Sequence, residues 1–205
     1  MEFIQQFLAE ATAVIERLDT LQIEKTVHLL SALQKTRGRL FILGVGGSAG
    51  NASHAVNDFR KIGGFEAYTP VDNVSELTAR TNDEGWPSIF SRWLEVSKLN
   101  NKDTLFVLSV GGGDAQNNVS PNLVNALRYG KEVKANIIGI VGRDGGYTKQ
   151  VADACVLIPS ITVERETPYA EAFQAVIWHL LVTHPLLKIE KTKWETVACQ
   201  SAQCS

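Results

Sequence analysis

The distribution of apolar residues along the chain predicts strands that alternate with helices. Five short apolar runs are typical of buried strands, and they lie at residues 40–44, 65–68, 104–109, 137–141 and 155–158. Segments with helical spacing lie between these runs, which favours a parallel sheet with right-handed crossovers. Because such sheets bind ligands beyond the carboxyl ends of their strands, the residues after each strand are the first candidates for a site.

Two helices are predicted ahead of the first strand. Apolar residues recur at helical spacing over residues 2–18, and a second helical pattern covers about 23–36 and ends near Gly38. These helices either cover one face of their own sheet or form an arm that packs on a partner subunit. A last long helix is predicted over 167–187, and the polar, irregular chain from Lys188 onward is interpreted as a tail or a partner-binding extension.

Length and composition favour one globular domain. The chain has 205 residues, of which 44% are hydrophobic and 20% charged, and its formal net charge is -2 without a basic stripe, so we expect no nucleic-acid partner. Neither a signal peptide nor an apolar run of about 20 residues occurs, so we expect no membrane association and a cytoplasmic protein. Three cysteines without paired spacing predict no disulfide framework; Cys155 is expected to be a buried thiol, whereas Cys199 and Cys204 lie in the polar tail.

A glycine-rich turn connects the first predicted strand to a helix. Its residues are Gly44, Gly46, Gly47 and Ser48. Free N–H groups at a helix start favour an anion such as a phosphate, and His54 and Asp58 follow on one helical face. The spacing matches neither the dinucleotide fingerprint nor a P-loop, so we expect no nucleotide cofactor. The alternative is an ordinary tight connection of an α/β protein.

Further candidate residues follow the third strand and lie in the last helix. Ser109, Gly111 and Gly112 belong to a second glycine-rich turn, and Ser120 precedes Pro121 as a possible helix cap. The turn at 142–146 offers no obvious catalytic group and is interpreted as structural. Glu171 and His179 are eight residues apart, which returns them to nearly the same face of a helix.

Five stretches, in this order, resemble the sugar isomerase (SIS) domain family, and within it the phosphoheptose isomerases. They are Gly44 to Ser48 with His54 and Asp58, then 77–95, 108–114, 139–146, and Glu171 with His179. The resemblance implies an α/β, doubly wound, mainly five-stranded parallel sheet in three layers, as in flavodoxin, with an N-terminal helical arm at 1–37. We predict a single SIS domain over 1–188 and a C-terminal tail over 189–205.

The resemblance also implies roles for individual residues. The substrate and its phosphate would contact Gly46, Gly47, Ser48, Asn82, Asp83, Ser109, Gly111, Gly112 and Ser120. A divalent metal such as zinc would be held by His54, Asp58, Glu171 and His179, and catalysis would depend on Asp58, Glu171 and His179. Family members are commonly homotetramers with active sites between subunits.

Several positions depart from the pattern of the family. Asp58 replaces a glutamate, Glu171 a glutamine and Val45 an asparagine, and Val110, Gly111 and Asp114 stand where hydroxyl residues are usual. Asp114 would repel a phosphate, so we expect it to point away or to bind a sugar hydroxyl. These changes bear on the identity of the sugar more than on the reaction type.

The predicted reaction is an aldose-ketose isomerisation, most simply between D-sedoheptulose 7-phosphate and D-glycero-D-manno-heptose 7-phosphate through an enediol. It requires a base, an acid and stabilisation of an oxyanion. With a metal, Asp58 or Glu171 would be the base and His179 the acid; Asp58 could instead bind the metal while Glu171 abstracts the proton. Without a metal, the same groups could act by proton transfer alone. Taken singly, each of these side chains is more often a structural histidine or a solvated charge.

Two other functions stay open from the sequence. The altered loop at 110–114 allows isomerisation of a different phosphosugar. Some proteins of this fold are non-catalytic sugar-phosphate sensors, or scaffolds that bind a replication initiator. The retained acid, base and metal candidates favour an enzyme, because a sensor needs only the anion-binding turn.

Overall fold

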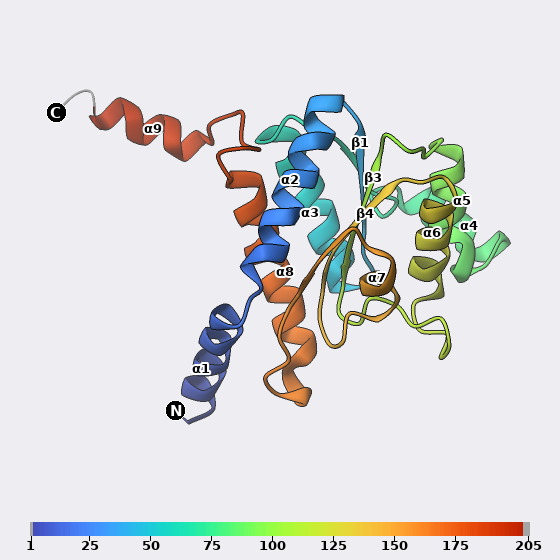
Figure 1. Ribbon diagram of the computed structural model, residues 1–205, viewed down its shortest axis with the longest axis horizontal. Helices are drawn as coiled ribbons and strands as arrows, with labels where there is room; N and C mark the ends of the chain where they lie inside the picture. Colours follow the sequence, from blue (N-terminus) through green and yellow to red (C-terminus); the bar gives the residue numbers. More distant parts are fainter. Residues whose placement is uncertain (1, 203–205) are drawn as a thin grey trace.

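A five-stranded parallel sheet forms the centre of the molecule (Figure 1). The computed structural model describes residues 2–202, with side chains described up to residue 197. The strand order is β2-β1-β3-β4-β5, and the strands are β1 Arg39–Leu43, β2 Glu66–Tyr68, β3 Thr104–Ser109, β4 Asn136–Val141 and β5 Ala154–Leu157. Every predicted strand is present to within one residue at each end. The predicted doubly wound fold is therefore confirmed.

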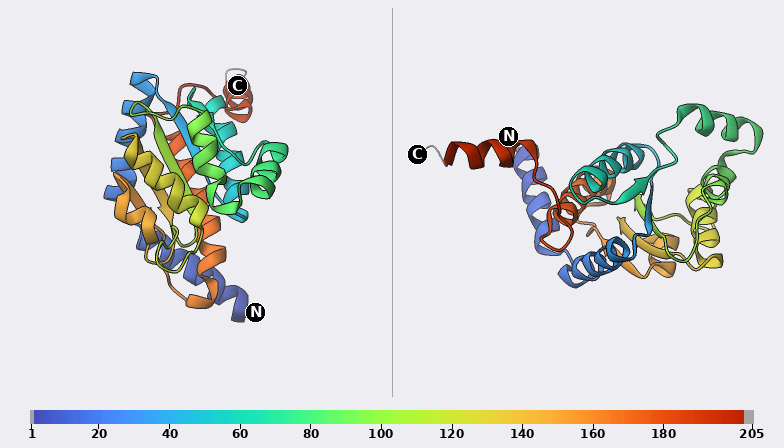
Figure 2. Two further views of the ribbon diagram at one scale, coloured as in Figure 1. Left: turned by 90° about the vertical axis from the view of Figure 1, so that its right-hand side faces the viewer. Right: turned by 90° about the horizontal axis from the view of Figure 1, so that it is seen from above.

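Helices cover both faces of this sheet and form two separate cores (Figure 2). One face carries α1 Glu2–Glu16, α2 Thr20–Thr36, α3 Gly47–Lys61 and α8 Glu166–Thr183. The other carries α4 Val74–Asp83, η1 Trp86–Ser88, α5 Ile89–Val96, α6 Pro121–Glu132 and α7 Gly146–Val151. The short turn η2, Val163–Arg165, leads into α8. Three layers result, with the sheet in the middle.

The central strand β3 shows why the sheet is buried on both sides. All six of its residues are buried. Phe106 and Leu108 belong to the core beneath α3 and α8, whereas Leu105 and Val107 belong to the core beneath α5 and α6. Because successive side chains of a strand point to opposite faces, a continuous apolar run is what a strand with two covered faces requires.

The N-terminal helix α1 is fixed to α8 by a buried charge network. Arg165 donates from Nε and from a terminal nitrogen to the two carboxylate oxygens of Glu10, at 2.6 Å each. The Tyr169 hydroxyl donates to the same carboxylate and to the carbonyl of Phe7. These contacts hold the pKa of Glu10 at about 2, chiefly through Arg165. The arm therefore packs on its own subunit along one side, while Phe3, Ile4, Leu8 and Ile15 are exposed on it.

Of two predicted helix ends, one differs from the structure in position and the other only in its hydrogen bonding. The last long helix ends at Thr183 rather than 187, because His184 precedes Pro185 and takes an extended backbone. Ser120 occupies the cap position of α6, with Pro121 in the first turn as predicted. Its side chain makes no capping hydrogen bond, since its backbone is left-handed with φ of 50°. The predicted cap position is therefore confirmed, but the hydrogen bond from the serine side chain that a cap usually makes is absent.

The C-terminal segment is more ordered than predicted. Residues Lys193–Ala202 form α9, which projects from the body of the molecule (Figure 1). The preceding chain is anchored, because the N–H groups of Ile189 and Glu190 donate to the carbonyl of Ile62 at the end of α3. The side chain of Cys199, and residues 203–205 with Cys204, lie outside what is described. Over 2–202, no helix combines the length and apolar character needed to cross a bilayer.

Candidate active site

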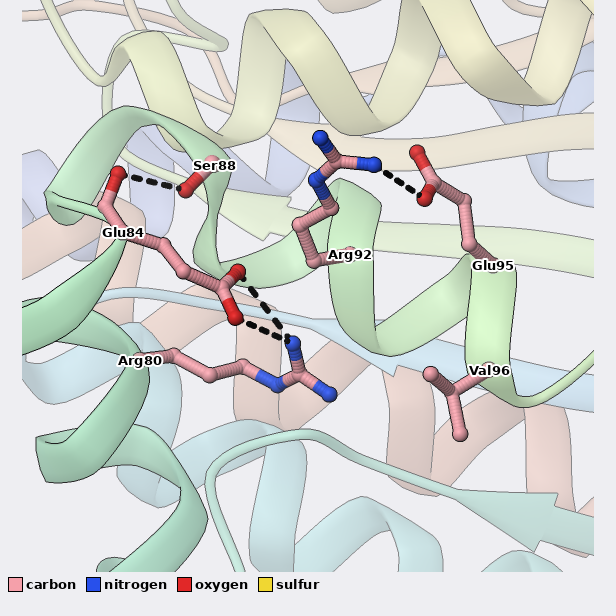
Figure 3. A pocket seen from close by; sticks show the side chains of 6 residues that line it. All are labelled: Arg80, Glu84, Ser88, Arg92, Glu95 and Val96. Atoms are coloured by element: carbon pink, nitrogen blue, oxygen red, sulfur yellow. Dashed lines mark hydrogen bonds and ion pairs between the residues drawn. The ribbon is translucent and has the colours of Figure 1, made fainter.

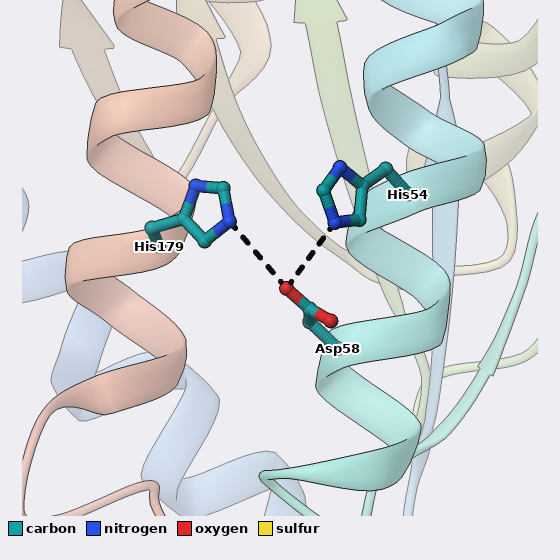
Figure 4. A group of neighbouring side chains, drawn as sticks. All are labelled: His54, Asp58 and His179. Carbon is teal, nitrogen blue, oxygen red and sulfur yellow. Dashed lines mark ion pairs between the residues drawn. The ribbon is translucent and has the colours of Figure 1, made fainter. Parts of the chain in front are cut away.

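Two imidazoles and a carboxylate come together between α3 and α8 (Figure 4). Nε2 of His54 lies 3.6 Å from Oδ2 of Asp58, and Nε2 of His179 lies 3.5 Å from the same oxygen. The ligand atoms of all three residues lie within 4.8 Å of one another. His54 and Asp58 come from one face of α3, and His179 comes from the neighbouring helix α8. We call this group the His-Asp cluster.

The orientation of each group in the His-Asp cluster is fixed by its neighbours. Nδ1 of His179 lies 2.7 Å from the carbonyl of Ala175, a contact in which the ring nitrogen must donate. Nε2 therefore faces Asp58 with its lone pair or with a second proton. Asp58 is buried and accepts a hydrogen bond from Asn57 at Oδ1, which leaves Oδ2 toward the imidazoles. Both histidines are about half exposed, so the cluster opens to the surface.

The donor set of the His-Asp cluster fits a divalent transition metal. Zinc ligands lie about 2.0–2.2 Å from the ion, so neighbouring ligand atoms of a tetrahedral site are roughly 3.3–3.6 Å apart. The two nitrogen-to-oxygen distances, 3.5 and 3.6 Å, lie in that range. Three protein ligands with a free fourth position are typical of a catalytic zinc site.

Glu171, the fourth predicted member, does not join the His-Asp cluster. Its carboxylate lies against Gly47 in the first turn of α3, so closely that any Cβ at position 47 would overlap it. The reason is helix geometry: eight residues of α8 separate Glu171 from His179, which is about 12 Å along the axis. Within one subunit the structure therefore groups three of the four predicted metal ligands, with Glu171 beside the glycine turn.

Three residues that sequence reasoning did not assign to the site support it. Asn51 donates from its side chain to the carbonyl of Glu171 and to the side chain of Gln174, which joins α3 to α8. Gln174 is fully buried. The ring of Trp178 packs against both imidazoles, edge-on to His54 and stacked on His179. The sequence offered one signal for these hydrogen bonds between α3 and α8. Asn51 lies one turn before His54, and Gln174 lies one turn after Glu171.

The first glycine turn has the properties of an anion site. Gly46 has φ of 62°, a left-handed conformation that favours glycine, and precedes the first residue of α3. Ser48 is buried in the first turn of that helix. Among the described residues, its hydroxyl has no hydrogen-bond partner. A buried unpartnered hydroxyl at the positive end of a helix dipole can serve a bound anion.

The second glycine turn follows β3 and is braced by α7. The hydroxyl of Ser109 accepts from the N–H of Gly112, and the carbonyl of Gly112 accepts from the side chain and the N–H of Thr148. Asp114 turns into its own loop, where its carboxylate accepts from the N–H groups of Gln116 and Asn117 and from the Asn117 side chain. These bonds, chiefly from Asn117, lower the pKa of Asp114. The carboxylate of Asp114 is thus hydrogen-bonded within its own loop.

Asn82 and Asp83 lie on the far side of the sheet from the His-Asp cluster. They end the exposed helix α4 and hydrogen-bond to each other at 2.8 Å. Part of α4 packs through Leu77 on the core beneath α5 and α6. Within one subunit the structure does not bring these residues to the cluster.

A separate cavity of about 620 Å³ lies between α4 and α5 (Figure 3). It is lined by Arg80, Glu84, Ser88, Arg92, Glu95 and Val96. Each arginine is already paired, Arg80 with Glu76 and Glu84, and Arg92 with Glu95. No predicted site residue lines this cavity, and its charges compensate one another.

Comparison with known proteins agrees with this fold. The SIS domain family matches residues 3–142. The phosphoheptose isomerase of Helicobacter pylori strain P12 is 31% identical over 187 residues, covering 86% of this chain and 90% of that protein. The lincomycin biosynthesis protein LmbN of Streptomyces lincolnensis is 34% identical over 154 residues, covering 70% of this chain and 54% of that protein.

Similarity to a solved structure extends the agreement to three dimensions. The phosphoheptose isomerase of Neisseria gonorrhoeae superposes with a TM-score of 0.77 at 21% identity, covering 88% of this chain and 96% of that one. At that identity the likeness concerns the fold. The sequence matches cover most of the chain. The chain therefore belongs to the SIS domain family, and phosphoheptose isomerases are among its relatives.

Proposed function

We propose that this protein is an aldose-ketose isomerase that interconverts D-sedoheptulose 7-phosphate and D-glycero-D-manno-heptose 7-phosphate. The observation that carries the proposal is the His-Asp cluster, because two imidazoles and a carboxylate within 4.8 Å of one another supply both a proton acceptor and proton donors. Relatives named phosphoheptose isomerase at 30–31% identity support the choice of substrate.

Asp58 is the proposed base and His179 the proposed acid. The carboxylate removes a proton from C1 of the ketose, and the electron pair forms the enediol as the C2 carbonyl oxygen gains a proton from His179. Return of the proton to C2, with loss of the O1 proton to the imidazole, completes the aldose. Asp58 suits the first step because Oδ2 is free of other donors and faces both imidazoles.

A bound metal would change this assignment. Nε2 of both histidines and Oδ2 of Asp58 would hold a zinc ion, which supplies Lewis acidity toward the substrate oxygens. Those three atoms cannot bind a metal and exchange protons at once. In a metal-dependent enzyme Glu171 is then the remaining carboxylate that could act as base, from its place beside Gly47.

The substrate's phosphate is proposed to bind near the glycine turns. Ser109 accepts from Gly112, so its own hydroxyl proton is available to a phosphate oxygen. Ser48 offers a buried hydroxyl without a partner among residues 2–202. Gly46, Gly47, Gly111, Gly112 and Ser120 complete the proposed contacts. The altered residues of the second turn, and the relative from lincomycin biosynthesis, make a different phosphosugar the second candidate substrate.

A homotetramer with shared active sites is proposed as the assembly. The apolar side chains of Phe3, Ile4, Leu8 and Ile15 are exposed on α1, which suits contact with a second copy. A site between subunits would also bring the Asn82 and Asp83 pair of one copy toward the His-Asp cluster of another. We keep one SIS domain over 1–188 with an extension after it, and a cytoplasmic location, as predictions.

The test is to incubate the purified protein with sedoheptulose 7-phosphate and follow aldose formation by NMR in D₂O. We expect aldose with deuterium at C2, because the abstracted proton exchanges with solvent at the enediol stage. Binding of the sugar phosphate without turnover would contradict the enzyme and favour a sensor. Turnover of another phosphosugar, tested in parallel, would keep the reaction type and replace the substrate.

A further inference from the structure

We propose that Arg143 provides the cationic contact for the phosphate of the substrate, in a subsite formed with the glycine turn after β3. This inference rests on the proposed function and deepens it. It also revises the interpretation of the turn at 142–146 as purely structural. Arg143 follows β4, which pairs with β3, so both turns lie at the carboxyl edge of neighbouring strands.

The two turns enclose one cavity of about 380 Å³. Residues that line it include Gly111, Gly113, Asp114, Arg143 and Tyr147. The Cδ atom of Arg143 lies 3.8 Å from the place where a Cβ on Gly111 would stand, which is ordinary van der Waals contact. The aliphatic part of the arginine side chain therefore lies beside the position at which the family usually has a hydroxyl residue.

The polar groups of the glycine turn leave donors for an anion. The carbonyls of Gly112 and Gly113 accept hydrogen bonds from Thr148 and Tyr147 in α7. No hydrogen bond within the described part of the chain uses the N–H of Gly111 or of Gly113. Gly111 and Gly113 line the same cavity as Arg143. Unused N–H groups and a guanidinium are the donors that recognise a phosphate.

The acids around this cavity are already engaged. Asp114 is bonded within its own loop, and Asp144 accepts from the N–H of Gly146. Arg143 itself is paired with Glu166, with its Nε 3.3 Å from a carboxylate oxygen, and 62% of its side chain is exposed. Its terminal nitrogens donate no hydrogen bond to the described residues. Glu166 also accepts from the Ser160 hydroxyl. The two terminal nitrogens of Arg143 thus remain available for a forked contact with a phosphate.

The experiment compares Arg143→Gln with Arg143→Lys and with the control Arg92→Gln. Arg92 has the same charge, a similar exposure and a single glutamate partner, Glu95, on a helix remote from the glycine turns. Two quantities are measured: the KM and kcat for sedoheptulose 7-phosphate, and the affinity for inorganic phosphate by calorimetry at constant ionic strength. Circular dichroism checks that each variant is folded.

We expect Arg143→Gln to raise KM and weaken phosphate binding by about 10- to 100-fold, the effect of one lost charged hydrogen bond. The kcat should change by less than about threefold, Arg143→Lys should be intermediate, since it keeps the charge and loses the fork, and Arg92→Gln should match the wild type. If Arg143→Gln bound phosphate as Arg92→Gln does, or lost only kcat, the proposal would be overturned. If Arg143→Gln did not fold, the Arg143→Lys result would decide: phosphate affinity equal to the wild type would overturn the proposal.

The phosphate measurement separates this inference from the proposed function. A wild type that turns over no sugar phosphate, yet loses phosphate affinity on Arg143→Gln, would refute the isomerase and support the subsite. If the wild type were an active isomerase and Arg143→Gln kept its phosphate affinity, the proposed function would be supported and the subsite refuted.

Discussion

The carboxylate of Glu171 lies directly against Gly47, where the first turn of α3 begins. A negative charge is favoured at this end of a helix by the dipole and by free N–H groups. The contact exists only because position 47 has no side chain. Glu171 is therefore placed beside the glycine turn by the absence of a side chain at position 47.

Substitution of Gly47 by alanine should displace Glu171 without unfolding the protein. Alanine is the better helix former by about 0.8–1 kcal/mol, and the atoms in its way are the end of a flexible side chain. We expect a thermal midpoint equal to or a few degrees above that of the wild type, with an altered kcat/KM. In a Glu171→Ala background, Gly47→Ala should have no further effect on kcat/KM. Additive effects in this double-mutant cycle would contradict the contact.

Asp58→Asn should abolish most of the isomerase activity if Asp58 is the base. The amide cannot accept the proton, and loss of general base catalysis costs about 100- to 10,000-fold in kcat. With a chelator present, so that no metal occupies the His-Asp cluster, Glu171→Gln should retain most of the activity in the same NMR assay. Glu24→Gln, on the exposed side of α2, is the control for loss of one carboxylate. If Glu171→Gln were inactive and Asp58→Asn active, the roles of the two acids would be reversed.

A divalent metal should stabilise the folded protein through the His-Asp cluster. At a free zinc concentration 100 times the dissociation constant, binding contributes about 2.7 kcal/mol, which corresponds to roughly 5–10 °C in the thermal midpoint. We expect this shift, and its reversal by a chelator, in the wild type and in His28→Gln. His28 is an exposed histidine on α2, away from the cluster. His54→Gln should lack the shift, and a shift of equal size in that variant would place the metal elsewhere.

The ion pair between Glu10 and Arg165, which fixes α1, should make the free energy of unfolding decrease at acidic pH. The pKa of Glu10 is lowered from 4.5 to about 2, so its contribution to stability is complete above about pH 5 and is lost as the pH falls from there through 2. Urea unfolding should show Glu10→Gln less stable than the wild type at pH 7, with the difference shrinking toward pH 2.5.

Glu16→Gln provides the control for this measurement, because it removes an exposed carboxylate of α1 without an arginine partner in the described chain. Its stability relative to the wild type should change little with pH. If the difference in unfolding free energy between Glu10→Gln and the wild type did not change with pH, the contact between Glu10 and Arg165 would not depend on the charge of Glu10.

The sequence by itself determined the fold and indicated the candidate site residues. Apolar runs such as Thr104–Ser109 predict strands because a parallel sheet buries both faces, and the spacing of His54 and Asp58 places them on one side of a helix for reasons of local geometry alone. Local patterns also favoured the wrong end for the last helix, where the extended backbone before Pro185 stops it at Thr183.

Only the tertiary structure decided which of these groups meet. His179 reaches the cluster because α8 packs beside α3 at the register fixed by Asn51 and Gln174, whereas Glu171, two turns earlier on α8, reaches Gly47 instead. Arg143 gained a candidate role for the same reason, since its neighbour Gly111 belongs to a different turn. Distances between helices and turns are set by packing across the sheet, and residue spacing along one element carries no information about them.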